Sequence, residues 1–129
     1  MFRDKPENGV IMSILTTIAI SIVIVLHVLF LVLEMFLWNT TAGRKTFGLS
    51  EDFAKQSAVL AANQGLYNGF LAAGLLWGLF GTGGKDALIF FLGCIIIAGL
   101  YGTLTASRKI LFLQALPAVI AIALLLLNN

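Results

Sequence analysis

Four long apolar runs, separated by short polar stretches, account for most of the chain. The runs cover residues 10–38, 57–80, 87–105 and 110–127. At 1.5 Å of rise per helical residue, each run is long enough to cross about 30 Å of hydrocarbon. Short connections place consecutive helices beside each other in antiparallel order. The pattern predicts an all-α fold, an integral membrane up-down four-helix bundle, with residues 1–129 forming one transmembrane domain.

The polar stretch between the first two runs contains signals for a helix end and a helix start. Gly43 is a plausible helix stop, because glycine readily ends a helix. Ser50 is followed by Glu51 and Asp52, which is typical of an N-cap and an acidic first turn. We therefore expect the second long helix to begin near Ser50, ahead of its apolar run.

Composition supports the membrane class and excludes several others. The chain is 60% hydrophobic and 11% charged, with a mean hydropathy of +1.02, which is unlike an ordinary soluble domain. The net charge of +2 is spread along the chain and gives no basic face for nucleic acid. Cys94 is the single cysteine, so no internal disulfide can form. The first run is much longer than a signal-peptide core and is expected to remain as a span.

Basic residues near the ends of the runs indicate an orientation. More of them lie in the first and third loops than on the other side. Because cytoplasmic loops carry an excess of Lys and Arg, we expect a multi-pass protein of the inner (cytoplasmic) membrane with these two loops in the cytoplasm. The first and third loops hold Arg44, Lys45, Lys55, Arg108 and Lys109, and the other side holds Arg3, Lys5 and Lys85.

Polar side chains inside the apolar runs are the candidates for function, because they are costly in hydrocarbon. In an antiparallel bundle nearly all of them fall in the half next to the first and third loops. His27 and Glu34 are two turns apart on one helix face, and Asn68 and Tyr101 are at a depth where either can partner His27. The predicted ligand-binding residues are His27, Glu34, Trp38, Asn63, Gln64, Tyr67, Asn68 and Tyr101.

These residues support several functions. The favoured one is binding or transport of a small amphipathic or hydrophobic molecule, with Glu34 as a counter-charge for a cation. The alternatives are a membrane enzyme in which Glu34 and His27 act as an acid/base pair, and a structural or partner-binding scaffold. Interhelical amides can also serve simply as hydrogen-bonding contacts, the interpretation preferred for Gln114. One His and one Cys give no metal set, and no cofactor motif is present.

Small residues recur at four-residue spacing within the second run, at Ala61, Gly65, Gly69 and Ala73. Such a ladder lets two helices approach closely, either within the bundle or across a homodimer interface through the Gly65/Gly69 face. In the last run, Pro117 removes one backbone hydrogen bond and is expected to kink the helix.

Three segments resemble a known family. LEMFLW at 33–38, GRKTFGL at 43–49 and NQGLYNGFLAAGLLWG at 63–78 are similar to the small four-helix bacterial membrane proteins catalogued as domain of unknown function 1304. The resemblance covers most of the chain and implies a compact integral membrane protein, but no activity. The motif residues it implies here are Glu34, Trp38, Phe47, Asn63, Gln64, Gly65, Tyr67, Asn68 and Gly69.

Overall fold

The protein is all α-helical in the part that its computed structural model describes, which is the backbone of residues 7–128 and the side chains of residues 13–128. This part holds five α-helices, one π-helical segment and no strand, so the predicted fold class is confirmed at this level. The elements are α1 (Glu7–Met35), α2 (Thr41–Phe47), α3 (Glu51–Phe80), α4 (Gly84–Thr105), η1 (Leu111–Ala115) and α5 (Leu116–Leu127).

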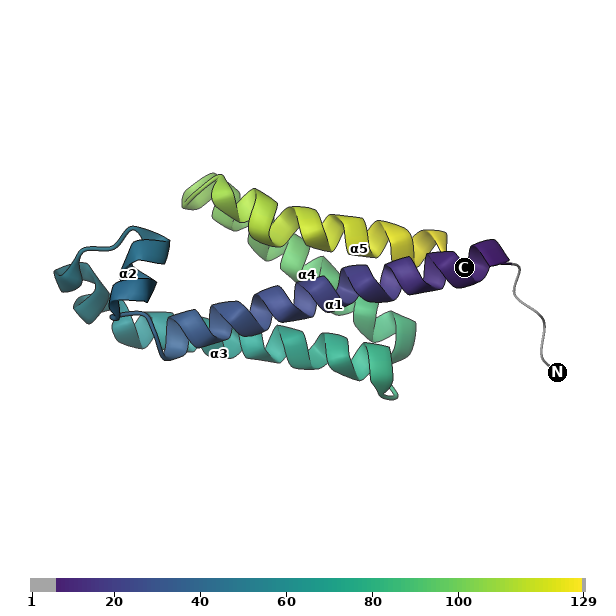
Figure 1. Cartoon of the computed structure of the whole chain (residues 1–129), viewed down its shortest axis with the longest axis horizontal. Helices are drawn as coiled ribbons and strands as arrows, with labels where there is room; N and C mark the ends of the chain where they lie inside the picture. Colours follow the sequence, from purple (N-terminus) through teal and green to yellow (C-terminus); the bar gives the residue numbers. More distant parts are fainter. Residues whose placement is uncertain (1–6, 129) are drawn as a thin grey trace.

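The four longer helices pack together in chain order. α1 lies against α3, α3 against α4, and α4 against η1 and α5, which return to contact α1. Figure 1 shows α2 and the turn between α4 and α5 at the same end of the molecule. Residues from the first and third loops are therefore close in space, although about 60 positions separate them in the sequence.

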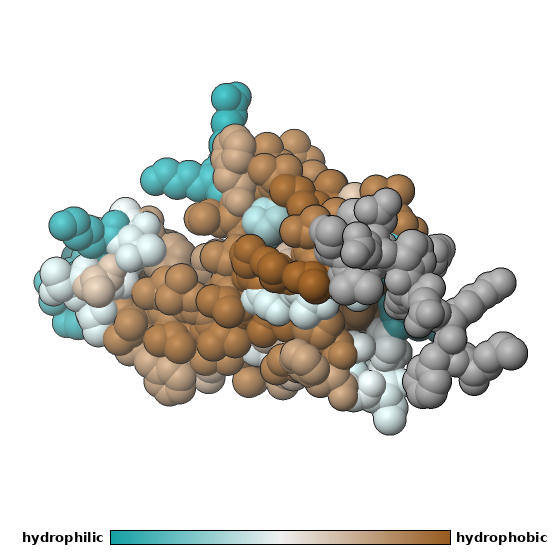
Figure 2. Space-filling model, turned by 45° about the vertical axis from the view of Figure 1, so that its right-hand side comes forward, coloured by the Kyte–Doolittle hydropathy of each residue, from teal (hydrophilic) through white to brown (hydrophobic). Residues whose placement is uncertain are grey.

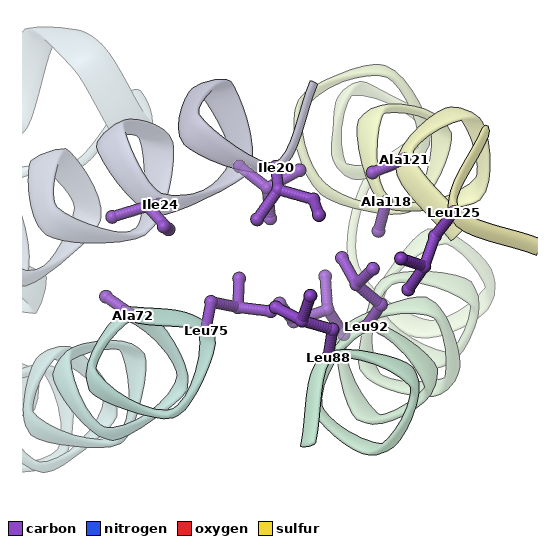
Figure 3. Packing of buried hydrophobic residues seen from close by; sticks show 11 residues of the cluster. Ile20, Ile24, Ala72, Leu75, Leu88, Leu92, Ala118, Ala121 and Leu125 are labelled. Carbon is purple, nitrogen blue, oxygen red and sulfur yellow. The ribbon is translucent and has the colours of Figure 1, made fainter. Parts of the chain in front are cut away.

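The hydrophobic core lies between these four helices, toward the α3–α4 turn. Ile20 of α1, Leu75 of α3 and Leu92 of α4 are fully buried and face one another (Figure 3). α5 contributes small side chains, Ala118 and Ala121, which let it come close to α1 and α4. The half of the bundle nearer α2 contains less of this core.

Glycines on α3 determine which helices approach it closely. A Cβ at Gly65 would lie 3.1 Å from the carbonyl oxygen of Leu31, and one at Gly69 would lie 2.6 Å from its Cδ1. Gly74 and Gly78 make the equivalent close contacts with α4. Within the bundle, the Gly65/Gly69 face of the small-residue ladder packs against α1. The homodimer stays a prediction.

The first loop contains a helix that the sequence pattern did not predict. The hydroxyl of Thr40 accepts a hydrogen bond from the Gly43 N–H (3.2 Å) and caps α2, and Gly48 ends it with a φ of 67°. The expectation that Gly43 stops a helix is wrong, because Gly43 lies inside α2, buried against the carbonyl of Leu37. The first long helix ends at Met35, three residues before the predicted end.

The predicted start of the second long helix is confirmed. The Ser50 hydroxyl accepts a hydrogen bond from the Phe53 N–H (3.2 Å), and Glu51 and Asp52 fill the first turn of α3. Negative side chains there compensate the positive end of the helix dipole. α3 ends at Phe80 and α4 ends at Thr105, both as predicted, but α4 begins at Gly84 instead of residue 87.

Pro117 is associated with an irregular turn in the last predicted run. The Leu116 N–H donates to the Leu111 carbonyl, five residues back, so residues 111–115 form a π-helical turn before α5 begins. Pro117 lies at the start of α5 directly after this turn, and it has no N–H with which to continue the helical hydrogen-bond pattern. Isolated π-helical turns are rare and are often found at functional sites.

Two of the described helices are long and apolar enough to cross a membrane by length and composition. They are Ser13–Met35, with a mean hydropathy of 2.8, and Gly84–Thr105, with 2.3. The apolar helix at Leu111–Leu127 is shorter, and α3 is not among the two, since polar residues such as Asn63 and Gln64 interrupt its apolar sequence. By this measure, two of the four spans that the sequence pattern predicts are candidates for crossing a membrane.

Candidate ligand-binding cavity

A cavity of about 580 Å³ lies at the end of the bundle that carries α2. Its walls come from the C-terminal part of α1, from α2 and the loop after it, from α3, and from the α4–α5 turn with η1. The lining residues are Phe30, Glu34, Trp38, Lys45, Thr46, Phe47, Gly48, Leu49, Gln64, Asn68, Ala106, Ser107, Lys109, Ile110, Leu113 and Gln114. We call this space the α2-end cavity.

A carboxylate and an amide form a pair in the wall of this cavity. The Asn68 Nδ2 of α3 donates a hydrogen bond to Glu34 Oε1 of α1 at 2.8 Å. Asn68 is buried, whereas Glu34 is half-buried and reaches the cavity. Gly65 and Gly69 lie on either side of this level on α3, and their close approach to α1 brings the amide within reach of the carboxylate. One carboxylate oxygen therefore has a fixed donor.

Aromatic rings form another wall of the α2-end cavity. The ring centroids of Trp38 and Phe47 are 4.9 Å apart at an interplanar angle of 43°, so the turn after α1 packs directly on α2. The Trp38 Nε1 donates to the Ser57 hydroxyl of α3 at 3.0 Å, which fixes the indole. Phe30 adds a third ring on α1. Together these rings make this wall of the cavity largely apolar.

Further polar groups line the cavity nearer solvent. Gln64 of α3 is exposed, and Gln114 of η1 is half-buried. Lys45 of α2 and Lys109 of the α4–α5 turn are exposed and come from two different elements; we call them the rim lysines. In Figure 2, hydrophilic side chains gather toward the α2 end, and apolar side chains cover most of the middle of the face shown.

His27 is buried beside the cavity and does not line it. Its exposed fraction is 0%, and its Nδ1 lies 2.8 Å from the Val23 carbonyl. A carbonyl only accepts hydrogen bonds, so Nδ1 carries the hydrogen, and Nε2 has no partner within the described residues. Phe30 meets the imidazole edge to face at a centroid distance of 6.0 Å. Phe30 thus contacts the imidazole and also lines the cavity.

The partners suggested for His27 are not found. Asn68 bonds Glu34 instead, and Tyr101 is 70% exposed on the outer face of α4. Tyr67 is 57% exposed and Asn63 is also exposed, and neither is among the lining residues. Of the eight predicted site residues, the structure brings four together in the wall of the α2-end cavity: Glu34, Trp38, Gln64 and Asn68.

Several lining residues were not among the predicted site. Lys45 and Phe47 reach the cavity because α2 folds back over the end of α1, and the short α2 has no apolar periodicity to reveal it. Gln114, which the sequence assigned to packing, is carried into the wall by η1. Pro117, three residues later, is the sequence signal that could have marked this turn. Among residues 13–128, no three His, Cys, Asp or Glu side chains are grouped so as to hold a metal ion.

The comparisons with known proteins identify the family. The family described as "Protein of unknown function (DUF1304)" matches residues 21–126. The chain is also 31% identical over 115 residues to the uncharacterized protein YpaA of Lactococcus lactis subsp. lactis (strain IL1403), covering 86% of this chain and 96% of that protein. No solved structure is significantly similar to the chain. As the three sequence segments predict, the protein belongs to the DUF1304 family, whose function is unknown.

Proposed function

We propose that this protein is a multi-pass protein of the cytoplasmic membrane that binds a small amphipathic molecule in the α2-end cavity. In this proposal α1, α3, α4 and η1–α5 cross the bilayer as an up-down four-helix bundle. The observation that carries the proposal is the Glu34–Asn68 pair, set in the wall of a cavity that is otherwise largely aromatic and apolar. Such polar groups near hydrocarbon are most often functional.

The distribution of side chains supports membrane insertion. Only 28% of the most apolar stretch in each of the two candidate spans is buried, whereas the core helix of a soluble protein is mostly buried. Large apolar side chains point outward instead, among them Val25 on α1, Ile97 on α4 and Phe112 on η1. Apolar surface on this scale needs a hydrocarbon solvent or a partner. With the first and third loops in the cytoplasm, the α2-end cavity opens on that side.

The size and lining of the cavity suit a small molecule. A volume of about 580 Å³ is within the range of ligand pockets, which are mostly apolar with a few polar groups that set orientation. Trp38, Phe47 and Phe30 provide the apolar surface. Glu34 and Gln64 provide hydrogen-bonding groups on facing helices. An amphipathic ligand satisfies both kinds of group.

The geometry favours binding over transport and catalysis. A route from the α2-end cavity to the opposite end would pass the fully buried core around Ile20, Leu75 and Leu92. The suggested acid/base pair is divided, since Glu34 lines the cavity and the fully buried His27 does not.

A thermal-shift screen in mild detergent tests the proposal. The panel contains long-chain fatty acids, quinones, aromatic acids and amphipathic cations, since any ligand that binds only the folded state raises its melting temperature. Glu34→Gln keeps the shape and the acceptor for Asn68 but removes the charge. We expect its melting temperature to stay near the parent value and its response to the ligand to fall.

Glu51→Gln is the matched control, because Glu51 is exposed in the first turn of α3 and does not line the cavity. It should respond to the ligand as the parent does. If no member of the panel stabilises the parent protein, or if Glu34→Gln responds fully, the cavity is not a ligand site of this kind, and a scaffold that acts through a protein partner becomes the better explanation.

A further inference from the structure

We infer that the ligand of the α2-end cavity is an anionic amphiphile whose acidic group lies between the rim lysines, Lys45 and Lys109. This inference rests on the proposed function and adds the chemical class of the ligand. It differs from the expectation drawn from sequence, in which Glu34 acts as the counter-charge for a cation. The difference comes from two residues that only the structure places at the cavity.

The balance of charge in the lining is positive. Three lining residues are ionisable, and they are Glu34, Lys45 and Lys109. The carboxylate already accepts a hydrogen bond from Asn68 at 2.8 Å, whereas neither rim lysine forms an ion pair with any carboxylate in residues 13–128. A cationic ligand entering from the open side would meet two ammonium groups before it reached the single carboxylate. An anion meets two attractive charges at that point.

The rim lysines are held on separate, ordered elements. Lys45 belongs to α2, which the Thr40 hydroxyl caps and the aromatic contact of Phe47 with Trp38 fixes to the end of α1. Lys109 follows a tight turn in which its N–H donates to the Ser107 hydroxyl at 3.2 Å. Two ammonium groups supplied from different elements to one cavity can hold the oxygens of a carboxylate, sulfonate or phosphate between them.

The other lining residues indicate the chemistry of the rest of the ligand. Below the rim, Trp38, Phe47 and Phe30 present ring surfaces that suit an aromatic or alkyl body. At the inner wall, Glu34 Oε1 is occupied by Asn68, and Oε2 has no hydrogen bond within the described residues. A hydroxyl or N–H on the ligand can donate to this oxygen. The expected ligand therefore carries an acidic group, an apolar body and a donor, in that order from the rim inward.

A matched pair of fluorescent probes tests the class. 1-Anilinonaphthalene-8-sulfonate has a sulfonate on an aromatic body, and N-phenyl-1-naphthylamine has the same skeleton without the sulfonate. Both carry the N–H, which lies beside the sulfonate in the first probe, so the pair tests the acidic group alone. Binding is measured in phosphatidylcholine nanodiscs by energy transfer from tryptophan to the probe, with empty discs subtracted. Trp38 lines the cavity and provides a nearby donor for the transfer.

Two double variants distinguish the effect of charge at the cavity on probe binding from the effect of the protein's overall charge. Lys45→Gln/Lys109→Gln removes both rim lysines, and Lys55→Gln/Arg108→Gln removes two exposed cations at the same end that do not line the cavity. We expect the first variant to raise the Kd for the sulfonate about tenfold, the effect of losing two solvent-exposed ion pairs, and to leave the Kd for the uncharged probe within about twofold. The second should change neither Kd, and salt should weaken only the binding that depends on the rim lysines.

A competition experiment distinguishes a lipid headgroup from a water-soluble acid as the natural anion. Phosphatidylglycerol added to the discs displaces the sulfonate if the natural anion is a lipid headgroup, and does not displace it if the anion is a water-soluble acid. Equal affinity of the rim-lysine variant and the parent for the sulfonate would overturn the inference while leaving the proposed function intact, provided that the uncharged probe binds. Failure of both probes to bind the parent would overturn both.

Discussion

Gly99 and Gly93 of α4 provide a direct test of how closely η1 packs on the bundle. A Cβ at Gly99 would lie 2.8 Å from the amide nitrogen and the Cβ of Ala115, which is fully buried in η1. A Cβ at Gly93 would meet nothing within 4 Å. Both glycines lie inside the same helix, so Gly→Ala gains about 1 kcal/mol of helix propensity at either position.

The difference in the free energy of unfolding between Gly99→Ala and Gly93→Ala therefore measures the effect of the contact with η1. Ala115 presents backbone atoms and a Cβ at Gly99, and none of these can rotate away. Overpacking of this kind costs about 1 to 3 kcal/mol. We expect Gly93→Ala to be more stable than the parent by about 1 kcal/mol and Gly99→Ala to be less stable than Gly93→Ala by about 1 to 3 kcal/mol.

Equilibrium unfolding of the purified protein in mild detergent, with sodium dodecyl sulfate as denaturant and helix content as the signal, measures both values. Equal stability of Gly99→Ala and Gly93→Ala would refute the close contact between α4 and η1. A second measurement connects the contact to the site. Gln114 precedes Ala115 and lines the α2-end cavity, so Gly99→Ala should also weaken binding of the sulfonate probe, whereas Gly93→Ala should not.

Three further substitutions have defined outcomes. Asn68→Leu removes the donor of the Glu34 carboxylate and should cost about 1 to 2 kcal/mol in the same unfolding assay; additive effects of Asn68→Leu and Glu34→Leu in a double-mutant cycle would contradict this. Ser50→Ala removes the N-cap of α3 and should cost about 1 kcal/mol, with faster amide exchange confined to the first turn. His27→Leu removes a buried nitrogen without a partner and should change stability by less than about 1 kcal/mol, whereas a loss above about 2 kcal/mol would mean that Nε2 is hydrogen-bonded in the folded protein.

The sequence predicted those features that depend on local patterns. The N-cap at Ser50 and the helix ends at Phe80 and Thr105 follow from short-range signals and are found as expected. α2 was missed because seven residues give too little periodicity, and because Gly43 has a packing role against Leu37 that resembles a stop signal in sequence. In the sequence, a glycine that allows two segments to pack closely cannot be distinguished from a glycine that ends a helix by its backbone conformation.

The candidate site was predicted less completely, because it depends on how helices rotate against each other. Depth along each run placed Glu34 and Asn68 in the same half of the bundle, but it matched Asn68 with His27 instead of Glu34, and it could not show that Tyr67 turns outward. The close contact of Gly65 with α1 fixes that rotation. The rim lysines could not be predicted as site residues for another reason. Their position at the cavity depends on α2 and on the turn before η1. Contacts of this kind join segments that no local pattern connects.

At the α2 end the glycine contacts divide the bundle into two units, which Gly74 and Gly78 join farther along α3, where it packs on α4. Gly65 and Gly69 bind α3 tightly to α1, and Gly99 binds α4 tightly to η1. The α2-end cavity lies between these two units, with Glu34 on one side and Gln114 on the other. A molecule in the cavity that touches both units holds them at a fixed separation, which is determined by the length of that molecule. A spectroscopic ruler between α2 and the α4–α5 turn, for example between spin labels at Thr41 and Ser107, should therefore report occupancy of the cavity as a narrower spread of distances.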